Sequence, residues 1–325
     1  MAYVFYLTRS EDDVSKLQAA WSNPETFVFL QEHGRVHSDW IEGGMASLPD
    51  NVQKGHFCLF TSGTTGQPKL IVGCRERAER LTFVLHDLQE LEDVEETILV
   101  LPLSYCYAFV NQWLWSIAFK RSFIYTSGFS DPEMLKKALD KADKAMLCLV
   151  ASQVPLFTKY FGNNISFPGI IRLNFAGSPF PQNKIKEIHD IFPNAKIFNN
   201  YGCAEAMPRL TIRPEDISSD GSNVGKLLPG IFMKTDEAGR ILFKSKYSAV
   251  GFYEHNKYSS IKDEDWIPSG DLGEEIEGSY WRISGRSDEI FKRFGEKISM
   301  PQLFKTVYAN WNGEASFYRE RDNVG

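Results

Sequence analysis

Between residues 97 and 200, short apolar segments alternate with longer segments in which apolar residues recur every three or four positions. The short segments have the length and composition of buried strands, and the longer ones have the spacing of amphipathic helices. This alternation predicts an α/β fold with mostly parallel sheets covered by helices. The expected strands are residues 97–102, 121–126, 146–152, 170–177 and 196–200.

Helical spacing is clearest in three segments. Residues 75–92 carry apolar side chains on a single stripe, which predicts an amphipathic helix. Residues 132–142 predict a second helix, and isoleucines at 185, 188 and 191 predict a third. The stripe of the first helix consists of Leu81, Val84, Leu85, Leu88 and Leu91.

After Pro214, glycine and proline separate short β-like runs such as residues 239–244 and 279–285. This pattern predicts a small β-barrel-like or sandwich subdomain beside the α/β body. From residue 289 we expect a strand pair with a turn at 294–295, a helix over 301–311 and a strand over 314–318. The expected domains are a large α/β and β-rich domain over 1–287, divided at about 213/214, and part of a small α+β domain over 288–325.

Composition excludes several classes of protein. The 325 residues are 43% hydrophobic and 24% charged, as in globular proteins, and the net charge of −6 disfavours a nucleic-acid partner. The five cysteines are scattered without a CxxC pair, which favours reduced thiols in the cytoplasm over disulfides or a zinc site. The longest apolar stretch, 108–119, contains Asn111 and Gln112 and is too short to span a membrane. Its helical spacing fits a pocket wall and ordinary core equally well.

An apolar segment runs into a tract of glycines and hydroxyl residues, LFTSGTTGQPK, at residues 59–69. Glycines let a loop turn its backbone N–H groups toward an anion, while hydroxyls and a lysine add further donors. The tract therefore favours a polyphosphate ligand, although it lacks the GxxxxGK[ST] spacing of a Walker loop. Its candidate ligand-binding residues are Thr61, Ser62, Gly63, Thr64, Thr65, Gly66 and Lys69.

A second tract, NNYGCAE at residues 199–205, follows the last expected strand and so lies at the edge where open α/β sheets bind ligands. An aromatic ring suits a purine, and a carboxylate oxygen suits Mg²⁺ bridging phosphates. Two further tracts, WIPSGDLG at 266–273 and GRSDEIFKRFGEKI at 285–298, add an aspartate and an arginine.

In this order, the four tracts resemble the motifs of the superfamily of acyl-CoA synthetases, adenylation domains and luciferases, which form acyl-adenylates from ATP. The resemblance implies that Tyr201 stacks on adenine near Asn200 and Gly202, and that Glu205 holds Mg²⁺. It also implies that Asp271 binds the ribose, that Arg286 contacts the nucleotide and that Asp288 is a hinge. Catalysis would fall to Glu205, Lys69 and Thr61. Weaker matches place Gly177, Ser178 and Pro179 beside the adenine.

The same resemblance places a substrate pocket at Tyr105, Cys106, Gly202 and Cys203. Relatives that activate amino acids carry an aspartate at the position of Cys106, so an α-amino acid substrate is disfavoured because its buried ammonium would have no partner. Aromatic residues near this pocket, Tyr105, Trp113 and Trp115, hint at an aryl or medium-length acid.

The sequence departs from the family at three places. Ala204 replaces a threonine whose hydroxyl contacts the α-phosphate, about sixty residues precede the phosphate tract instead of a longer region, and no residue matches the family's C-terminal lysine. Either a compact member or a fragment fits these departures.

The expected function is AMP-forming ligation of a carboxylic acid with ATP and Mg²⁺, followed by transfer to coenzyme A, to the phosphopantetheine of an acyl carrier protein or to an amine. Two alternatives stay open: a catalytically impaired nucleotide-binding scaffold or partner subunit, and an acyl-protein synthetase that uses Cys106 or Cys203.

Overall fold

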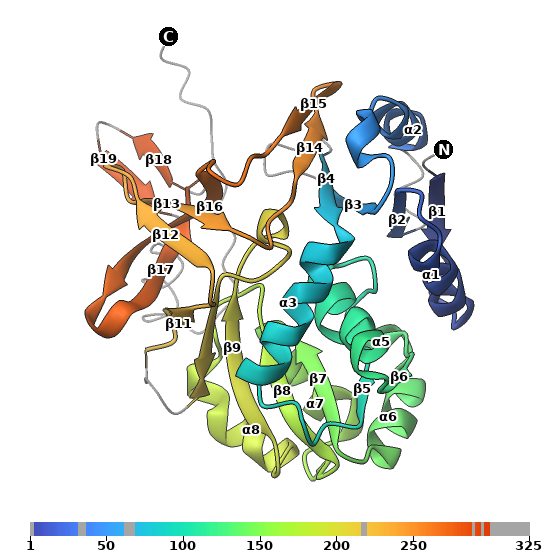
Figure 1. Ribbon diagram of the computed structural model, residues 1–325. Coiled ribbons are helices and arrows are strands. Elements are labelled where there is room, and N and C mark those ends of the chain that lie inside the picture. Colours follow the sequence, from blue (N-terminus) through green and yellow to red (C-terminus); the bar gives the residue numbers. More distant parts are fainter. Residues whose placement is uncertain are drawn as a thin grey trace.

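The computed structural model describes residues 3–31, 37–61, 69–215 and 220–287, together with the backbone of residues 290–293 and 296–299. Two large sheets dominate it: an 11-stranded sheet in the order β12-β13-β16-β17-β11-β10-β9-β8-β7-β5-β6, and a 6-stranded sheet in the order β1-β2-β3-β4-β14-β15 (Figure 1). Helices pack between the sheets and on the outer face of the larger one.

The expected alternating strands form the parallel part of the larger sheet, which confirms the α/β assignment. Each strand from β6 to β9 is parallel to its neighbour. Most apolar side chains of β5, β7, β8 and β9 are buried, whereas Phe123 and Ile124 of the edge strand β6 are partly buried. The first two strands are shorter than expected because the chain leaves the sheet after Ile98 and Ile124. The strands are β5 (Glu96–Ile98), β6 (Ser122–Ile124), β7 (Ala145–Leu149), β8 (Ile170–Phe175) and β9 (Lys196–Tyr201).

Helices follow the predicted amphipathic stripes. Leu81 and Leu85 of the first helix are buried between the sheets, whereas Leu88, at its end, is 36% exposed. The second begins at Pro132, and the Asp131 side chain caps it by accepting a hydrogen bond from the Met134 N–H. The helices are α3 (Arg75–Leu88), α6 (Pro132–Lys141), α7 (Val154–Phe161) and α8 (Ile185–Ile191).

The apolar stretch 108–119 belongs to an irregular helix. It consists of α4 (Cys106–Ala108), a π-helical segment η3 (Phe109–Leu114) and α5 (Trp115–Phe119). Trp113 and Trp115 are each 1% exposed and pack in the core, so they support the interpretation of this segment as core. Among the described residues, no helix combines the length and hydropathy needed to cross a membrane.

The smaller sheet begins in a region for which the sequence predicted no elements. Three parallel strands, β1 (Tyr3–Leu7), β2 (Phe27–Gln31) and β3 (His56–Thr61), bury a row of aromatic rings against α1 (Asp12–Ser22) and the helical layer. The remaining elements are α2 (Ser38–Ala46), β4 (Lys69–Cys74), β14 (Gly251–Glu254) and β15 (Lys257–Ser260).

The β-rich region after Pro214 is present, but its strands continue the two sheets instead of closing into a separate barrel. β10 pairs antiparallel with β9, and β14 pairs antiparallel with β4. The large sheet is parallel from β6 to β9. Short turns join β12 to β13 and β16 to β17, and all the strands of this sheet beyond β9 pair antiparallel. They are β10 (Thr211–Pro214), β11 (Asn223–Leu227), β12 (Ile231–Thr235), β13 (Arg240–Ser245), β16 (Ile267–Ile276) and β17 (Tyr280–Arg286).

Beyond residue 287, the expected strand pair is formed by β18 (Ile290–Arg293) and β19 (Glu296–Ser299), which are antiparallel. The helix expected over 301–311 and the strand expected over 314–318 lie outside the described residues.

Candidate functional site

The glycine- and hydroxyl-rich tract connects two antiparallel neighbours. β3 ends at Thr61, β4 begins at Lys69, and these two residues face each other across the pair. The two ends of the predicted phosphate loop therefore lie side by side, at one end of the two central strands of the smaller sheet. Ser62, Gly63, Thr64, Thr65 and Gly66 lie outside the described residues.

Lys69 and Glu205 meet although they are far apart in the sequence. The Lys69 ammonium lies 2.8 Å from a Glu205 carboxylate oxygen and 4.5 Å from the centre of the Phe252 ring. Both charged side chains are only about one-fifth exposed, at 19% and 22%. Glu205 lies in the short helix η7 (Ala204–Ala206) that follows β9, and its backbone carbonyl accepts a hydrogen bond from the Ala249 N–H. The structure thus joins two of the sequence-predicted catalytic residues.

A second cluster contains Tyr201, Asp271 and Arg286. The Tyr201 hydroxyl donates to Asp271 Oδ2 at 2.8 Å, and Arg286 Nη1 donates to Asp271 Oδ1 at 3.1 Å. Asp271 is 7% exposed, and its own N–H donates to the Ser269 hydroxyl. Burial, followed by the nearby Asp271 charge, raises the pKa of Tyr201. The tyrosine is therefore a neutral donor to a buried carboxylate at neutral pH.

Gly202, directly after Tyr201, lies where a side chain has no room. A Cβ atom there would come within 1.9 Å of the Pro208 carbonyl oxygen and 2.9 Å of Arg209 Cα. The turn after β9 therefore packs closely against the segment 208–209, and this contact requires glycine.

The residues predicted beside the adenine occupy different environments. Asn200 is 3% exposed, and its amide donates to Asn174 Oδ1 at 3.2 Å, so its side chain is engaged in the core. Gly177 has a φ of +76° in the turn after β8. The Ser178 hydroxyl accepts a hydrogen bond from the Ala151 N–H at 3.2 Å. Pro179 is next in this turn and is exposed.

The predicted pocket residues differ in exposure. Tyr105 is 55% exposed, whereas Cys106 is 8% exposed. Burial, and secondarily the charge of Glu205, raises the pKa of both the Cys106 and the Cys203 thiols. Since the thiolate is the nucleophile, these environments oppose covalent catalysis by either cysteine.

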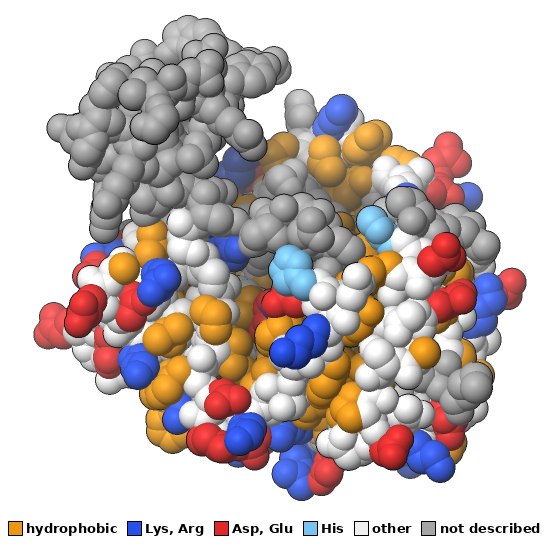
Figure 2. Space-filling view, turned by 90° about the horizontal axis from the view of Figure 1, so that it is seen from above, with side chains coloured by type: hydrophobic (Ala, Val, Ile, Leu, Met, Phe, Trp, Pro, Cys, Tyr) orange, Lys and Arg blue, Asp and Glu red, His pale blue; other side chains and the backbone are white. Residues whose placement is uncertain are grey.

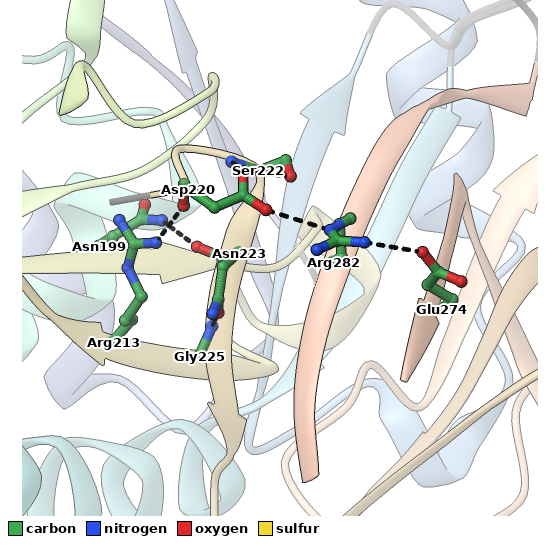
Figure 3. Close-up of polar contacts among 8 residues, drawn as sticks. All are labelled: Asn199, Arg213, Asp220, Ser222, Asn223, Gly225, Glu274 and Arg282. Carbon is green, nitrogen blue, oxygen red and sulfur yellow. Dashed lines mark hydrogen bonds and ion pairs between the residues drawn. The ribbon is translucent and has the colours of Figure 1, made fainter. Parts of the chain in front are cut away.

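Arg286 and Asp271 lie on neighbouring strands, β17 and β16, which polar contacts connect to β10 and β11 (Figure 3). Arg282 of β17 donates to Asp220 at 3.1 Å and to Glu274 at 3.2 Å. Arg213 of β10 donates to the Asp220 carbonyl oxygen. These contacts fix the strands that carry the cluster. Asp288, the predicted hinge, lies outside the described residues.

Both clusters lie near the carboxyl ends of the parallel strands, the side seen in Figure 2, where charged side chains lie among hydrophobic ones. The described residues contain no group of three His, Cys, Asp or Glu side chains able to hold a metal ion by themselves. Mg²⁺ commonly binds through one or two carboxylates together with substrate phosphates, and Glu205 beside Lys69 fits that arrangement. A carboxylate accepts hydrogen bonds from hydroxyl groups, so Asp271, beside Tyr201, fits a ribose.

Comparison with known proteins gives consistent matches. The model of a family described as AMP-binding enzyme matches residues 11–245. The chain is 26% identical to the D-alanine–D-alanyl carrier protein ligase of Staphylococcus haemolyticus (76% of this chain, 53% of that protein). It is 23% identical to the 2-succinylbenzoate–CoA ligase of Oceanobacillus iheyensis (74% and 51%). The chain thus spans about half the length of these curated relatives.

Among solved structures, the unliganded O-succinylbenzoate coenzyme A synthetase of Bacillus subtilis superposes with a TM-score of 0.74 at 13% identity, covering 95% of this chain and 76% of that one. The ATP-bound MatB of Rhodopseudomonas palustris gives a TM-score of 0.71 at 16% identity, covering 95% and 73%. These likenesses show that the α/β fold is shared.

Proposed function

Because the chain belongs to the AMP-binding enzyme family, we propose that it is an AMP-forming ligase that activates a carboxylic acid with MgATP. A carboxylate oxygen attacks the α-phosphorus, the bond to the bridging oxygen of pyrophosphate breaks, and an acyl-adenylate and pyrophosphate are formed. The observation that carries this proposal is the contact between Lys69 and Glu205. Lys69 lies at the end of the predicted phosphate loop, and Glu205 follows Tyr201, a member of the second cluster, by four residues.

The Lys69–Glu205 pair allows both charges to be partly buried, because each neutralises the other. Glu205 would hold Mg²⁺, which would supply charge neutralisation for the phosphates, and Lys69 would then pair with the phosphates of ATP. The loop from Thr61 through Gly66 adds backbone and hydroxyl donors. The rate enhancement comes from positioning and from charge stabilisation in the transition state.

The nucleoside lies against the second cluster. The Tyr201 ring stacks on adenine, with Asn200 behind it and the turn Gly177–Pro179 alongside. Asp271 accepts hydrogen bonds from the ribose hydroxyls while Arg286 holds the carboxylate in place or moves to the phosphates. Asp288 acts as the hinge to residues 289–325, and residues 1–287 form the adenylating domain.

The acid binds at Tyr105, Cys106, Gly202 and Cys203, beside the irregular helix. The names of the relatives, a CoA ligase and a carrier protein ligase, support a thiol acceptor, either coenzyme A or the phosphopantetheine of a carrier protein. All five cysteines, each among the described residues, are free thiols, which supports a cytoplasmic location. The raised pKa values of the Cys106 and Cys203 thiols argue against the acyl-protein synthetase alternative, because that activity needs a thiolate.

Acid-dependent release of pyrophosphate from ATP, measured over a panel of carboxylic acids, tests this proposal. The proposal is supported if an acid raises pyrophosphate release above the rate measured without acid, and if the Glu205→Ala variant loses this increase. A protein that binds MgATP and releases no pyrophosphate with any acid would favour the second candidate, a nucleotide-binding scaffold or partner subunit. The observation that favours this candidate is Ala204, which has no hydroxyl to offer the α-phosphate.

A further inference from the structure

Arg209 is a fully buried arginine whose hydrogen-bonding capacity is only partly used. The residue is 1% exposed. Its Nε and Nη2 atoms both donate to the same acceptor, Asn111 Oδ1, at 3.1 and 2.8 Å. Its Nη1 atom is buried and has no hydrogen-bond partner among the described residues. Buried polar atoms are usually satisfied, so such an atom needs an explanation.

No carboxylate of the described residues compensates this charge. The groups that interact electrostatically with Arg209 are Tyr107 and Cys148, and the guanidinium lies 5.1 Å from the Tyr107 ring centre. Burial raises the pKa of Tyr107, and it raises that of Cys148 to about 12, so both are neutral at pH 7. An arginine stays protonated in proteins, which leaves a buried positive charge paired only with neutral groups.

Arg209 lies directly behind the proposed nucleotide site. Its Cα would be 2.9 Å from a Cβ placed on Gly202, and the next residue, Leu210, donates its N–H to the Tyr201 carbonyl at 2.8 Å. The side chain extends to Asn111 in the π-helical segment η3, within the irregular helix that borders the predicted acid pocket. Arg209 therefore bridges the turn after β9 and the irregular helix that begins at Cys106, one of the predicted pocket residues.

A second unsatisfied donor lies in the same polar network. Asn174 Nδ2 is buried and has no hydrogen-bond partner among the described residues, while Asn174 Oδ1 accepts from Asn200. The Tyr107 hydroxyl lies near Asn200 and Cys148 without a well-formed hydrogen bond. Spare donors beside an uncompensated cation favour an anionic group as the missing partner.

We propose that Arg209 determines substrate specificity by binding a second anionic group on the acid, so that the preferred substrates are dicarboxylates. This inference rests on the proposed adenylation. The reacting carboxylate faces the phosphates at Lys69 and Glu205, and the second carboxylate pairs with the buried Arg209 guanidinium. A monocarboxylate of the same length leaves Nη1 unpaired, and the site discriminates against it for that reason.

Three variants test the proposal. Arg209→Met keeps the volume of the side chain and removes the charge. Asn111→Asp keeps the arginine and supplies an internal carboxylate at the position that now lies 2.8 Å from Nη2. Arg213→Met is the matched control. Arg213 is also buried and also has an atom, Nε, without a hydrogen-bond partner among the described residues, but its charge interacts with that of Asp220, and it donates to Gln182 and to the Asp220 carbonyl.

The measurement is the ratio of kcat/KM for dicarboxylates to that for monocarboxylates of equal chain length, from malonate to adipate. Wild-type and Arg213→Met proteins are expected to favour the best dicarboxylate by about 10- to 100-fold, as for one charged hydrogen bond. Arg209→Met and Asn111→Asp are expected to lose that preference. An absent preference in the wild type, or one that survives in Asn111→Asp, overturns the proposal.

Failure of the proposed adenylation can be distinguished from failure of anion binding at Arg209. If the protein turns over no acid, the proposed function fails, and thermal melting then decides the role of Arg209. A dicarboxylate that raises the Tm of the wild type but not that of Asn111→Asp supports anion binding at Arg209. Equal shifts, or none, refute it and leave Arg209 a structural residue solvated by buried water.

Discussion

Replacing Asp271 with asparagine should weaken nucleotide binding while leaving the fold intact. Asparagine keeps the shape of the side chain but removes the charge that accepts hydrogen bonds from Tyr201 and Arg286. In the proposed nucleotide complex, the same carboxylate accepts hydrogen bonds from the ribose hydroxyls. Hydrogen bonds to a charged group contribute about 1.5–3 kcal/mol, so the Kd for ATP and AMP should rise about 10- to 150-fold.

The cost to folding should be much smaller. The Arg286 side chain is 34% exposed, so water can solvate its guanidinium when the carboxylate is lost. The amide oxygen of asparagine can still accept the hydrogen bond of Tyr201, so we expect a loss of about 1 kcal/mol, the contribution of one ordinary hydrogen bond. Isothermal titration with ATP and AMP, alongside thermal melts, measures both effects.

The matched control for this substitution is Asp263→Asn. Asp263 also pairs with an arginine, Arg77, at 2.6 Å, but its side chain is 74% exposed. Its replacement should change neither nucleotide affinity nor Tm appreciably. Wild-type affinity in a folded Asp271→Asn protein would refute the ribose role, as would an equal loss of affinity in the control.

Three further substitutions and treatments follow from the site. Ala204→Thr should raise pyrophosphate release by about 10²-fold by restoring a hydroxyl donor, and an unchanged rate would show that the site does not use one there. Gly202→Ala should lower the free energy of unfolding, measured in urea, by about 1–3 kcal/mol, because the added Cβ would clash with backbone atoms. In the control, Gly43→Ala, the added Cβ lies in open space on α2, so this free energy should rise slightly. Because their pKa values are raised, Cys106 and Cys203 should react with iodoacetamide at pH 8 more slowly than an unfolded control; rapid labelling would contradict this.

The parallel part of the fold was predictable because its strands are buried on both faces. Such strands are continuous apolar runs, as in β7 and β8, and the helices between them carry clear stripes. Turn chemistry helped as well, since Asp131 and Pro132 mark the start of α6.

Other features depended on contacts between distant segments. β2 is stabilised by pairing with β3 and by packing against Trp21 and Phe109, and β1 is stabilised by pairing with β2. The sequences of the two strands do not reveal these contacts. The β-rich region follows local turn signals correctly, but pairing of β10 with β9 decides that it extends the larger sheet.

Some residues of the site could be predicted from local sequence, and others depend on contacts between distant segments. Residues in short motifs, such as Lys69, Glu205 and Asp271, could be found from the resemblance, and the structure brings the first two into contact. Arg209 could not be found in this way. Its sequence neighbours do not indicate that its side chain is buried or that it has no acidic partner among the described residues. Phe252, which covers Lys69, is likewise separated from it by most of the chain.

The path of oxygen during the reaction tests the central claim most directly. The protein is incubated with MgATP and a carboxylic acid labelled with ¹⁸O in its carboxyl group, hydroxylamine is added to trap the acyl group, and the AMP is analysed by mass spectrometry. If the carboxylate attacks the α-phosphorus, the AMP carries one labelled oxygen, because cleavage at the carbonyl leaves the bridging oxygen on phosphorus. Unlabelled AMP, or ADP as the product, would contradict acyl-adenylate formation.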